Sequence, residues 1–222
     1  MNTAATVVVD RLLRTPTRFM ASLESAEMRT TARALFATTL IAAAIFGACI
    51  GSYRGGLQTL YAAIKFPLVL VLTAALTIPV LTSLQSALGH KTSLSRDTTL
   101  VLSALAIASL MMAAASPVLF LCMDRGVSYH TTILLVVGTG AAGGFAGLTV
   151  LFAGLRAIPF THRATVLLTT LLVFALTGSQ MAWMMRPFLT RPATERAVFM
   201  RSPEGSFFDS VTRSLDSAQK GY

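Results

Sequence analysis

The sequence predicts an all-α membrane protein: a polytopic bundle of five transmembrane helices with an amphipathic interfacial helix at the N-terminus. Three observations support this fold class. Of the 222 residues, 54% are apolar and only 12% are charged, about half the charged fraction of a soluble domain. The mean hydropathy is +0.69. The charged residues gather near both termini and between long uncharged runs, which is typical of a polytopic membrane protein.

Residues 1–33 form the first predicted region, a basic amphipathic segment. Apolar residues recur at three- and four-residue steps between Val8 and Leu23, with arginines between them and an interruption near Pro16. This pattern predicts a helix lying in the membrane interface. The only apolar run before residue 30 is Val7 to Val9, too short for a cleavable signal peptide, so we expect the first span to direct insertion.

Five apolar runs are long enough to cross a hydrocarbon layer that needs about twenty helical residues. None carries a charge in its interior, and none shows the alternation of barrel strands, so we expect helices. The predicted spans are 34–52, 66–88, 98–121, 131–155 and 164–185.

The connection GSYRGGLQTLYAAIKFP precedes the second span. Its glycines allow a tight turn, and the apolar stripe that follows predicts a half-helix in the headgroup layer. In this interpretation Tyr61 is an interface anchor and the ammonium of Lys65 snorkels to the headgroups.

Pro79 in the second span and Pro117 in the third each remove a backbone donor. Both prolines predict helix kinks. Kinked helices can build a substrate site near the midplane, with Gln85, Ser83 or Ser116 as polar lining. Kinks are also ordinary features of membrane helices, and this is the interpretation that we favour.

The fourth span contains the glycine-rich stretch VVGTGAAGGFAGL. Gly140, Gly143, Gly144 and Gly147 are spaced at i, i+3, i+4 and i+7, which places them on one helical face. Such a face lets a neighbouring backbone approach closely and predicts a helix–helix contact. The partner is either another span of this chain or a second subunit.

The fifth span leaves the membrane in SQMAWMMRPFLTRP. Trp183 is expected in the aromatic belt and Arg186 in the headgroup layer, as interface anchors, while Pro187 ends the helix. A polar side chain is unusual at the depth of Gln180 in the span. We therefore predict that Gln180 hydrogen-bonds to another helix and acts as a packing lock for the end of the span. A place on a transport pathway is the alternative for Gln180.

The basic tail 186–222 contains a second, weaker amphipathic pattern, which is either an interfacial helix or a disordered segment. Five spans put the two termini on opposite sides of the membrane. Each side then carries nine Lys and Arg residues, and discounting the residues far from a span favours a cytoplasmic N-terminus.

Residues with catalytic or metal-binding chemistry are sparse. His90 and His162 are expected on one side of the membrane and His130 on the other, so the three cannot share a metal, and Asp97 is the only carboxylate near the pair. Cys49 and Cys122 form no CxxC motif and are expected to pack as small apolar residues. We therefore expect no enzyme activity, no cofactor and no metal.

The net charge of +9 comes from basic residues that flank the spans. They form no continuous basic face with interleaved aromatics, so we expect no nucleic-acid partner. Anionic lipid headgroups are the expected partner of these charges.

Two stretches in this order, GSYRGGLQTLYAAIKFPLVLVLTAALTIP and SQMAWMMRPF, resemble a group of uncharacterised bacterial integral membrane proteins. That group is loosely similar in architecture to the Yip family of Rab-interacting membrane proteins, and some of its members carry an actin-binding label. The resemblance covers about residues 51–208. It implies a five-span bundle in the inner membrane with a cytoplasmic N-terminus, and it brings no catalytic residue.

These features predict a non-enzymatic membrane component: a scaffold, an anchor or an accessory subunit that binds other membrane proteins or itself. The alternative is a small oligomeric transporter or channel built around the kinked second and third helices. A third hypothesis is an enzyme acting on lipid headgroups through the loop that holds Asp124 and His130.

Overall fold

The computed structural model describes residues 3–15, 19, 28–127, 129–156 and 160–184. This part of the chain is helical, with no strand. The helices are α1 (Thr3–Arg14), α3 (Met28–Ser52), α4 (Leu57–Ala87), α5 (Leu94–Asp124), α6 (Tyr129–Gly154) and α7 (Phe160–Met184).

The predicted all-α fold is confirmed for the described residues, and its five helices α3 to α7 are each long and apolar enough to cross a membrane. This composition is that of a multi-pass membrane protein. Each helix begins before its predicted span, and α5 also ends beyond its span. The two longest, α4 and α5, have 31 residues each, or about 46 Å, so they exceed a hydrocarbon layer of about 30 Å by roughly 8 Å at each end.

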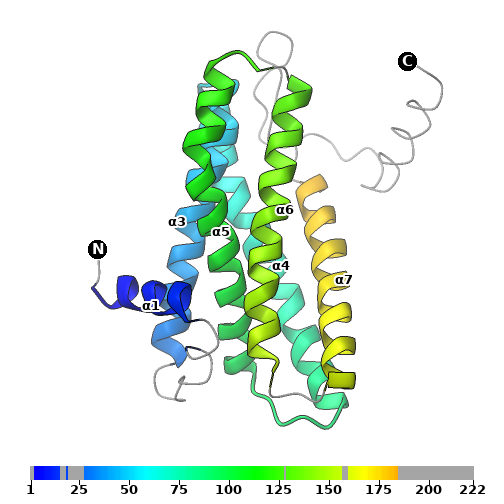
Figure 1. Ribbon diagram of the computed structural model, residues 1–222. Coiled ribbons are helices and arrows are strands. Elements are labelled where there is room, and N and C mark those ends of the chain that lie inside the picture. Colours follow the sequence, from blue (N-terminus) through cyan, green and yellow to red (C-terminus); the bar gives the residue numbers. More distant parts are fainter. Residues whose placement is uncertain (1–2, 16–18, 20–27, 128, 157–159, 185–222) are drawn as a thin grey trace, which may run out of the picture.

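The five long helices lie side by side along one common direction (Figure 1). Helix α3 packs against α4 and α5, α5 also packs against α6, and α7 packs mainly against α4. Helices α3 and α7 both start at the lower end of the bundle in Figure 1 and run toward the other end, which α7 does not reach within the described residues. We call the end that holds Met28 and the loop 88–93 the N-side.

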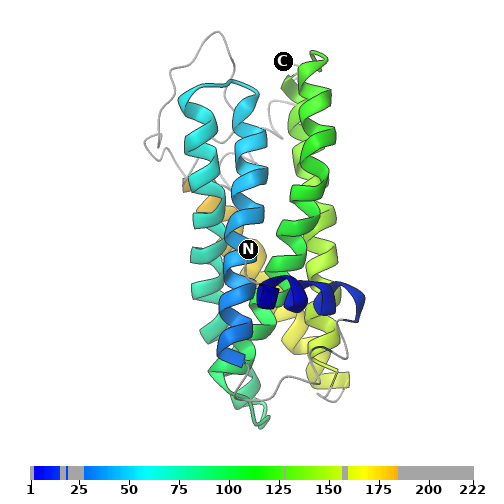
Figure 2. The ribbon, with the colours of Figure 1, turned by 90° about the vertical axis from the view of Figure 1, so that its left-hand side faces the viewer.

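Helix α1 crosses the bundle instead of following it (Figures 1 and 2). It ends at Arg14, two residues before Pro16, where a proline cannot continue a helix interior. Leu12 is fully buried, in a cluster with Leu35 of α3 and Leu102 and Ala106 of α5. The crosswise orientation is therefore fixed by side-chain packing and not only by the chain connection.

The contact between α3 and α4 depends on two glycines. A Cβ atom placed on Gly47 would lie 2.4 Å from the carbonyl oxygen of Ala62, and one on Gly51 would lie 2.6 Å from the carbonyl oxygen of Gln58. Neither position has room for a side chain, so the two backbones touch. This close approach brings the buried face of α4 into the centre of the bundle.

The connection before the second span differs from the prediction. Only residues 53–56 form the turn, and Gly55 and Gly56 adopt positive φ angles of 81° and 61° there. The expected half-helix is the first two turns of the continuous helix α4. Pro67, Pro79 and Pro117 all lie inside helices, and the kinks expected at Pro79 and Pro117 remain predictions.

Candidate functional site

The carboxylate of Asp97, on the N-side, accepts hydrogen bonds from three side chains. Ser93 caps α5, because its hydroxyl accepts from the backbone N–H of Arg96 at 3.3 Å. Asp97 follows in the first turn of α5 and is 1% exposed. A carboxylate is favoured there because it lies near the positive end of the helix dipole.

Three neutral side chains donate hydrogen bonds to Asp97. Oγ1 of Thr82 lies 2.8 Å from Oδ2, and Nε2 of Gln85 lies 2.9 Å from Oδ1. Oγ1 of Thr92 lies 2.9 Å from both carboxylate oxygens. Thr82 and Gln85 are three residues apart on α4, so both face α5. The cluster ties the end of α4 to the start of α5.

His90 and His162 meet on the same side, as expected from the alternation of the loops. Nε2 of His90 lies 3.3 Å from Nδ1 of His162, and the ring centroids are 5.4 Å apart. This contact joins the loop after α4 to the start of α7. The described residues contain no group of three or more His, Cys, Asp and Glu side chains that could hold a metal ion, and Asp97 is engaged by Thr82, Gln85 and Thr92.

Lys65 is placed differently from the prediction. It was expected to snorkel to the headgroups, but its side chain is 0% exposed inside the bundle. The reason is its position on α4: the buried face of this helix repeats every three or four residues, and Lys65 belongs to it. That face consists of Gln58, Ala62, Lys65, Val69, Thr73, Thr77, Leu81 and Gln85.

Buried hydroxyl groups in the spans are mostly bonded within their own helix. Thr77 donates to the carbonyl of Thr73, Ser103 to that of Thr99, and Ser116 to that of Met112. Such bonds satisfy a hydroxyl group without water. A polar residue in this interior therefore does not by itself indicate an aqueous path.

The four glycines of the predicted contact face divide into two pairs. A Cβ atom on Gly143 would lie 2.8 Å from the carbonyl oxygen of Ala108, and one on Gly147 would lie 2.7 Å from that of Ala104. This pair lies directly against α5 of the same chain. A Cβ atom on Gly140 or Gly144 would have nothing within 4 Å.

An apolar groove of about 260 Å³ lies between α5, α6 and α7. Its lining includes Ala108 of α5, Gly144 and Leu148 of α6, and Leu171 and Phe174 of α7. The groove exists because α7 packs mainly on α4 and leaves the side of α6 uncovered. Gly144 and Leu171 are exposed, so the groove opens on the outer surface of the bundle.

For the other predicted site residues the structure gives only the burial of the residue or no side-chain position. Tyr61 is half-buried on α4, and Gln180 is half-buried near the end of α7. Trp183 belongs to the last turn of α7, but the structure does not describe its side chain, and Arg186 lies outside the described residues. The packing lock at Gln180 and the anchors at Trp183 and Arg186 remain predictions.

The burial of Lys65 and the bonds of Asp97 were missed by sequence reasoning. The sequence did contain a signal for the burial of Lys65. If the helix of the second span is continued back through the first loop, Gln58, Lys65 and Gln85 lie on one helical face. No signal pointed to Asp97, because its donors come from a helix end and a loop that only the fold brings together.

Comparison with known proteins found no matching family model, no similar curated protein and no similar solved structure.

Proposed function

We propose that this protein is a non-enzymatic integral membrane component that acts as a scaffold, an anchor or an accessory subunit of a bacterial inner-membrane assembly. The observation that carries this proposal is the crosswise helix α1, which Leu12 fixes to the bundle. By analogy with the Yip-like proteins that the sequence resembles, we propose that the assembly takes part in membrane organisation. In this proposal the N-terminus is cytoplasmic and the termini lie on opposite sides.

The depth of α1 supports an interfacial position. Leu12 packs beside Leu102 and Ala106, which follow the start of α5 at Leu94 by about 12 and 18 Å. About 8 Å of α5 extends beyond the hydrocarbon layer. Subtracting this length places Leu12, and with it α1, roughly 5–10 Å inside the edge of the hydrocarbon layer. This is the depth at which amphipathic helices lie in the membrane interface.

The outward side of α1 offers both charge and apolar surface. Val7 and Leu13 are 48% and 56% exposed. Arg11 is exposed, and Nε of Arg14 donates to Oδ1 of Asp10 at 2.8 Å, a contact that raises the pKa of Arg14. A rigid helix with such a surface is suited to hold a partner at the level of the headgroups.

A photoreactive amino acid at Leu13 is expected to crosslink one defined protein in native membranes. The same amino acid at Ile41, which is 62% exposed on α3, is the control and is expected to yield lipid adducts. Crosslinked products are separated by electrophoresis and identified by mass spectrometry. Lipid adducts alone at both positions would contradict the scaffold.

Lys65 favours a second candidate function, a small oligomeric transporter or channel. It lies eight residues after the start of α4, about 12 Å along the helix, and thus just inside the hydrocarbon layer. Charged residues within spans mark ion pathways in many membrane proteins. A buried ammonium group would favour an anion as the solute.

Under this second function, proteoliposomes that contain the purified protein are expected to release chloride down its gradient. The flux is expected to fall at least tenfold in Lys65→Met, because the charge that attracts the anion is lost. Lys91→Met, in the exposed loop of the N-side, is the control and should conduct normally. Absence of chloride flux in the unmodified protein would exclude an anion channel.

A further inference from the structure

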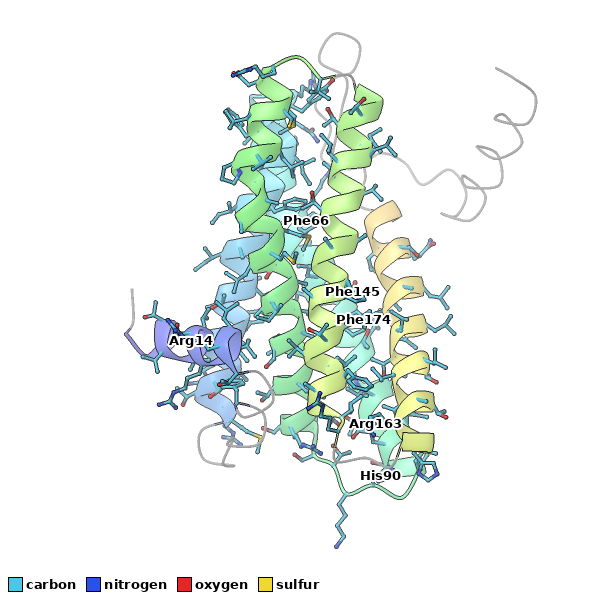
Figure 3. All side chains as sticks on the ribbon, viewed as in Figure 1. Arg14, Phe66, His90, Phe145, Arg163 and Phe174 are labelled. Atoms are coloured by element: carbon cyan, nitrogen blue, oxygen red, sulfur yellow. The ribbon has the colours of Figure 1, made fainter. Side chains whose placement is uncertain are left out.

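The apolar groove between α5, α6 and α7 ends on the N-side beside a group of cationic side chains. Helix α6 carries Phe152 one residue after the groove residue Leu151, and the guanidinium carbon of Arg163 lies 5.4 Å from the centroid of the Phe152 ring. Figure 3 shows Arg163 at this end, with Phe174 and Phe145 further along α7 and α6. Neither Phe152 nor Arg163 lines the groove; Arg163 lies at the N-side end of α6, beyond the groove residue Leu151, and we call this end of the groove its mouth.

Further positive charges surround the mouth. Nη2 of Arg96 donates to the carbonyl oxygen of Gly154 at 3.5 Å, so its guanidinium lies at the end of α6. Arg156 is exposed directly after α6. In the described segments around the mouth, residues 88–98, 154–156 and 160–164, the only carboxylate is Asp97, which is buried and engaged by Thr82, Gln85 and Thr92.

We propose that this groove binds one anionic phospholipid, with an acyl chain along α6 and α7 and the phosphate at Arg163. The apolar lining fits a hydrocarbon chain, and the cationic mouth complements a phosphate, which guanidinium groups bind with strong charge-assisted hydrogen bonds. The proposal is independent of the scaffold function.

The charge beside the groove favours a lipid over a transmembrane helix of a partner. An anionic headgroup complements Arg96, Arg156 and Arg163, whereas an uncharged partner helix would bring no counter-charge to these guanidinium groups. An acyl chain is thinner and can follow the groove from the headgroup layer inward.

Two variants test the proposal in the full-length protein. Arg163→Gln removes the charge at the mouth. Gly144→Leu fills the groove and should fold normally, because a Cβ atom there meets nothing within 4 Å. Matched controls are Arg125→Gln, an exposed arginine at the opposite end of α5, and Gly138→Leu, where a Cβ atom also meets nothing within 4 Å and which does not line the groove.

Native mass spectrometry of the purified protein in mild detergent measures the binding, with phosphatidylglycerol and phosphatidylcholine of identical acyl chains as probes. We expect one phosphatidylglycerol per chain, bound at least tenfold more tightly than phosphatidylcholine. Arg163→Gln and Gly144→Leu should each weaken its binding roughly 10- to 100-fold, and the two controls should not.

Four results would overturn the proposal. The first is equal binding of the two lipids. The second is unchanged phosphatidylglycerol binding in both Arg163→Gln and Gly144→Leu; if only one of these variants folds, unchanged binding in that variant is sufficient. The third is a dimer in the unmodified protein that only Gly144→Leu dissociates, which would assign the groove to a second copy. Displacement of phosphatidylglycerol by millimolar inorganic phosphate would likewise show that the mouth binds free phosphate and the groove holds no lipid chain.

Discussion

Replacing Asp97 with leucine is expected to lower the free energy of unfolding by about 3 kcal/mol. The side chains of Thr82, Gln85 and Thr92 would each lose the acceptor of a hydrogen bond, and each lost bond costs roughly 1 kcal/mol. The apparent melting temperature in detergent should fall by roughly 10 °C. Thermal melts followed by size-exclusion chromatography measure this change.

The conservative variant Asp97→Asn should lose less stability, because its carbonyl oxygen still accepts from part of the cluster. Asp124→Asn is the control, since Asp124 is exposed at the other end of α5, and its melting temperature should not change. Equal melting temperatures for Asp97→Leu and the unmodified protein would show that the cluster contributes nothing to stability.

Gly47→Leu is expected to be the second severe change. A Cβ atom at this position would lie 2.4 Å from the carbonyl oxygen of Ala62 and 3.0 Å from Cβ of Phe66. The nearest obstacle is backbone, so α3 and α4 must move apart. Overpacking of a close contact costs about 1–3 kcal/mol or more, and we expect a melting temperature lower by roughly 5–10 °C.

Gly138→Leu controls for the loss of a glycine from a helix. Its Cβ atom has open space, and leucine has the higher helix propensity by up to about 1 kcal/mol. This variant should melt at the same temperature as the unmodified protein or slightly above it. If Gly47→Leu did the same, the close approach of α3 and α4 would be wrong.

The fold class could be predicted from the sequence because it depends on local composition. Five uncharged apolar runs of about twenty residues leave few alternatives to five membrane helices. The ends of the helices were harder to predict, because an apolar run ends at the edge of the hydrocarbon layer, whereas the hydrogen-bonded helix continues beyond it. That difference made the start of α4 look like a separate half-helix and Lys65 look like an anchor.

The contacts between helices were only partly predictable. The glycine spacing identified one helical face, but Gly143 and Gly147 lie against α5 while a side chain on Gly140 or Gly144 would meet open space. Residues i and i+3 or i+4 are offset by tens of degrees around a helix axis, so a neighbouring helix can cover one pair and leave the other. Which pair is covered depends on the position of α5 in three dimensions.

The peripheral position of α7 bears on how the protein is made. Chains insert from the N-terminus during synthesis, so α3, α4, α5 and α6 can form their mutual contacts before α7 leaves the ribosome. Helix α7 then joins an existing four-helix unit through α4, with Val166 and Thr170 on its buried face. The docking of α7 on α4 would thus be a separate step of biogenesis, on which an insertase or chaperone that holds α7 until α4 is in place could act.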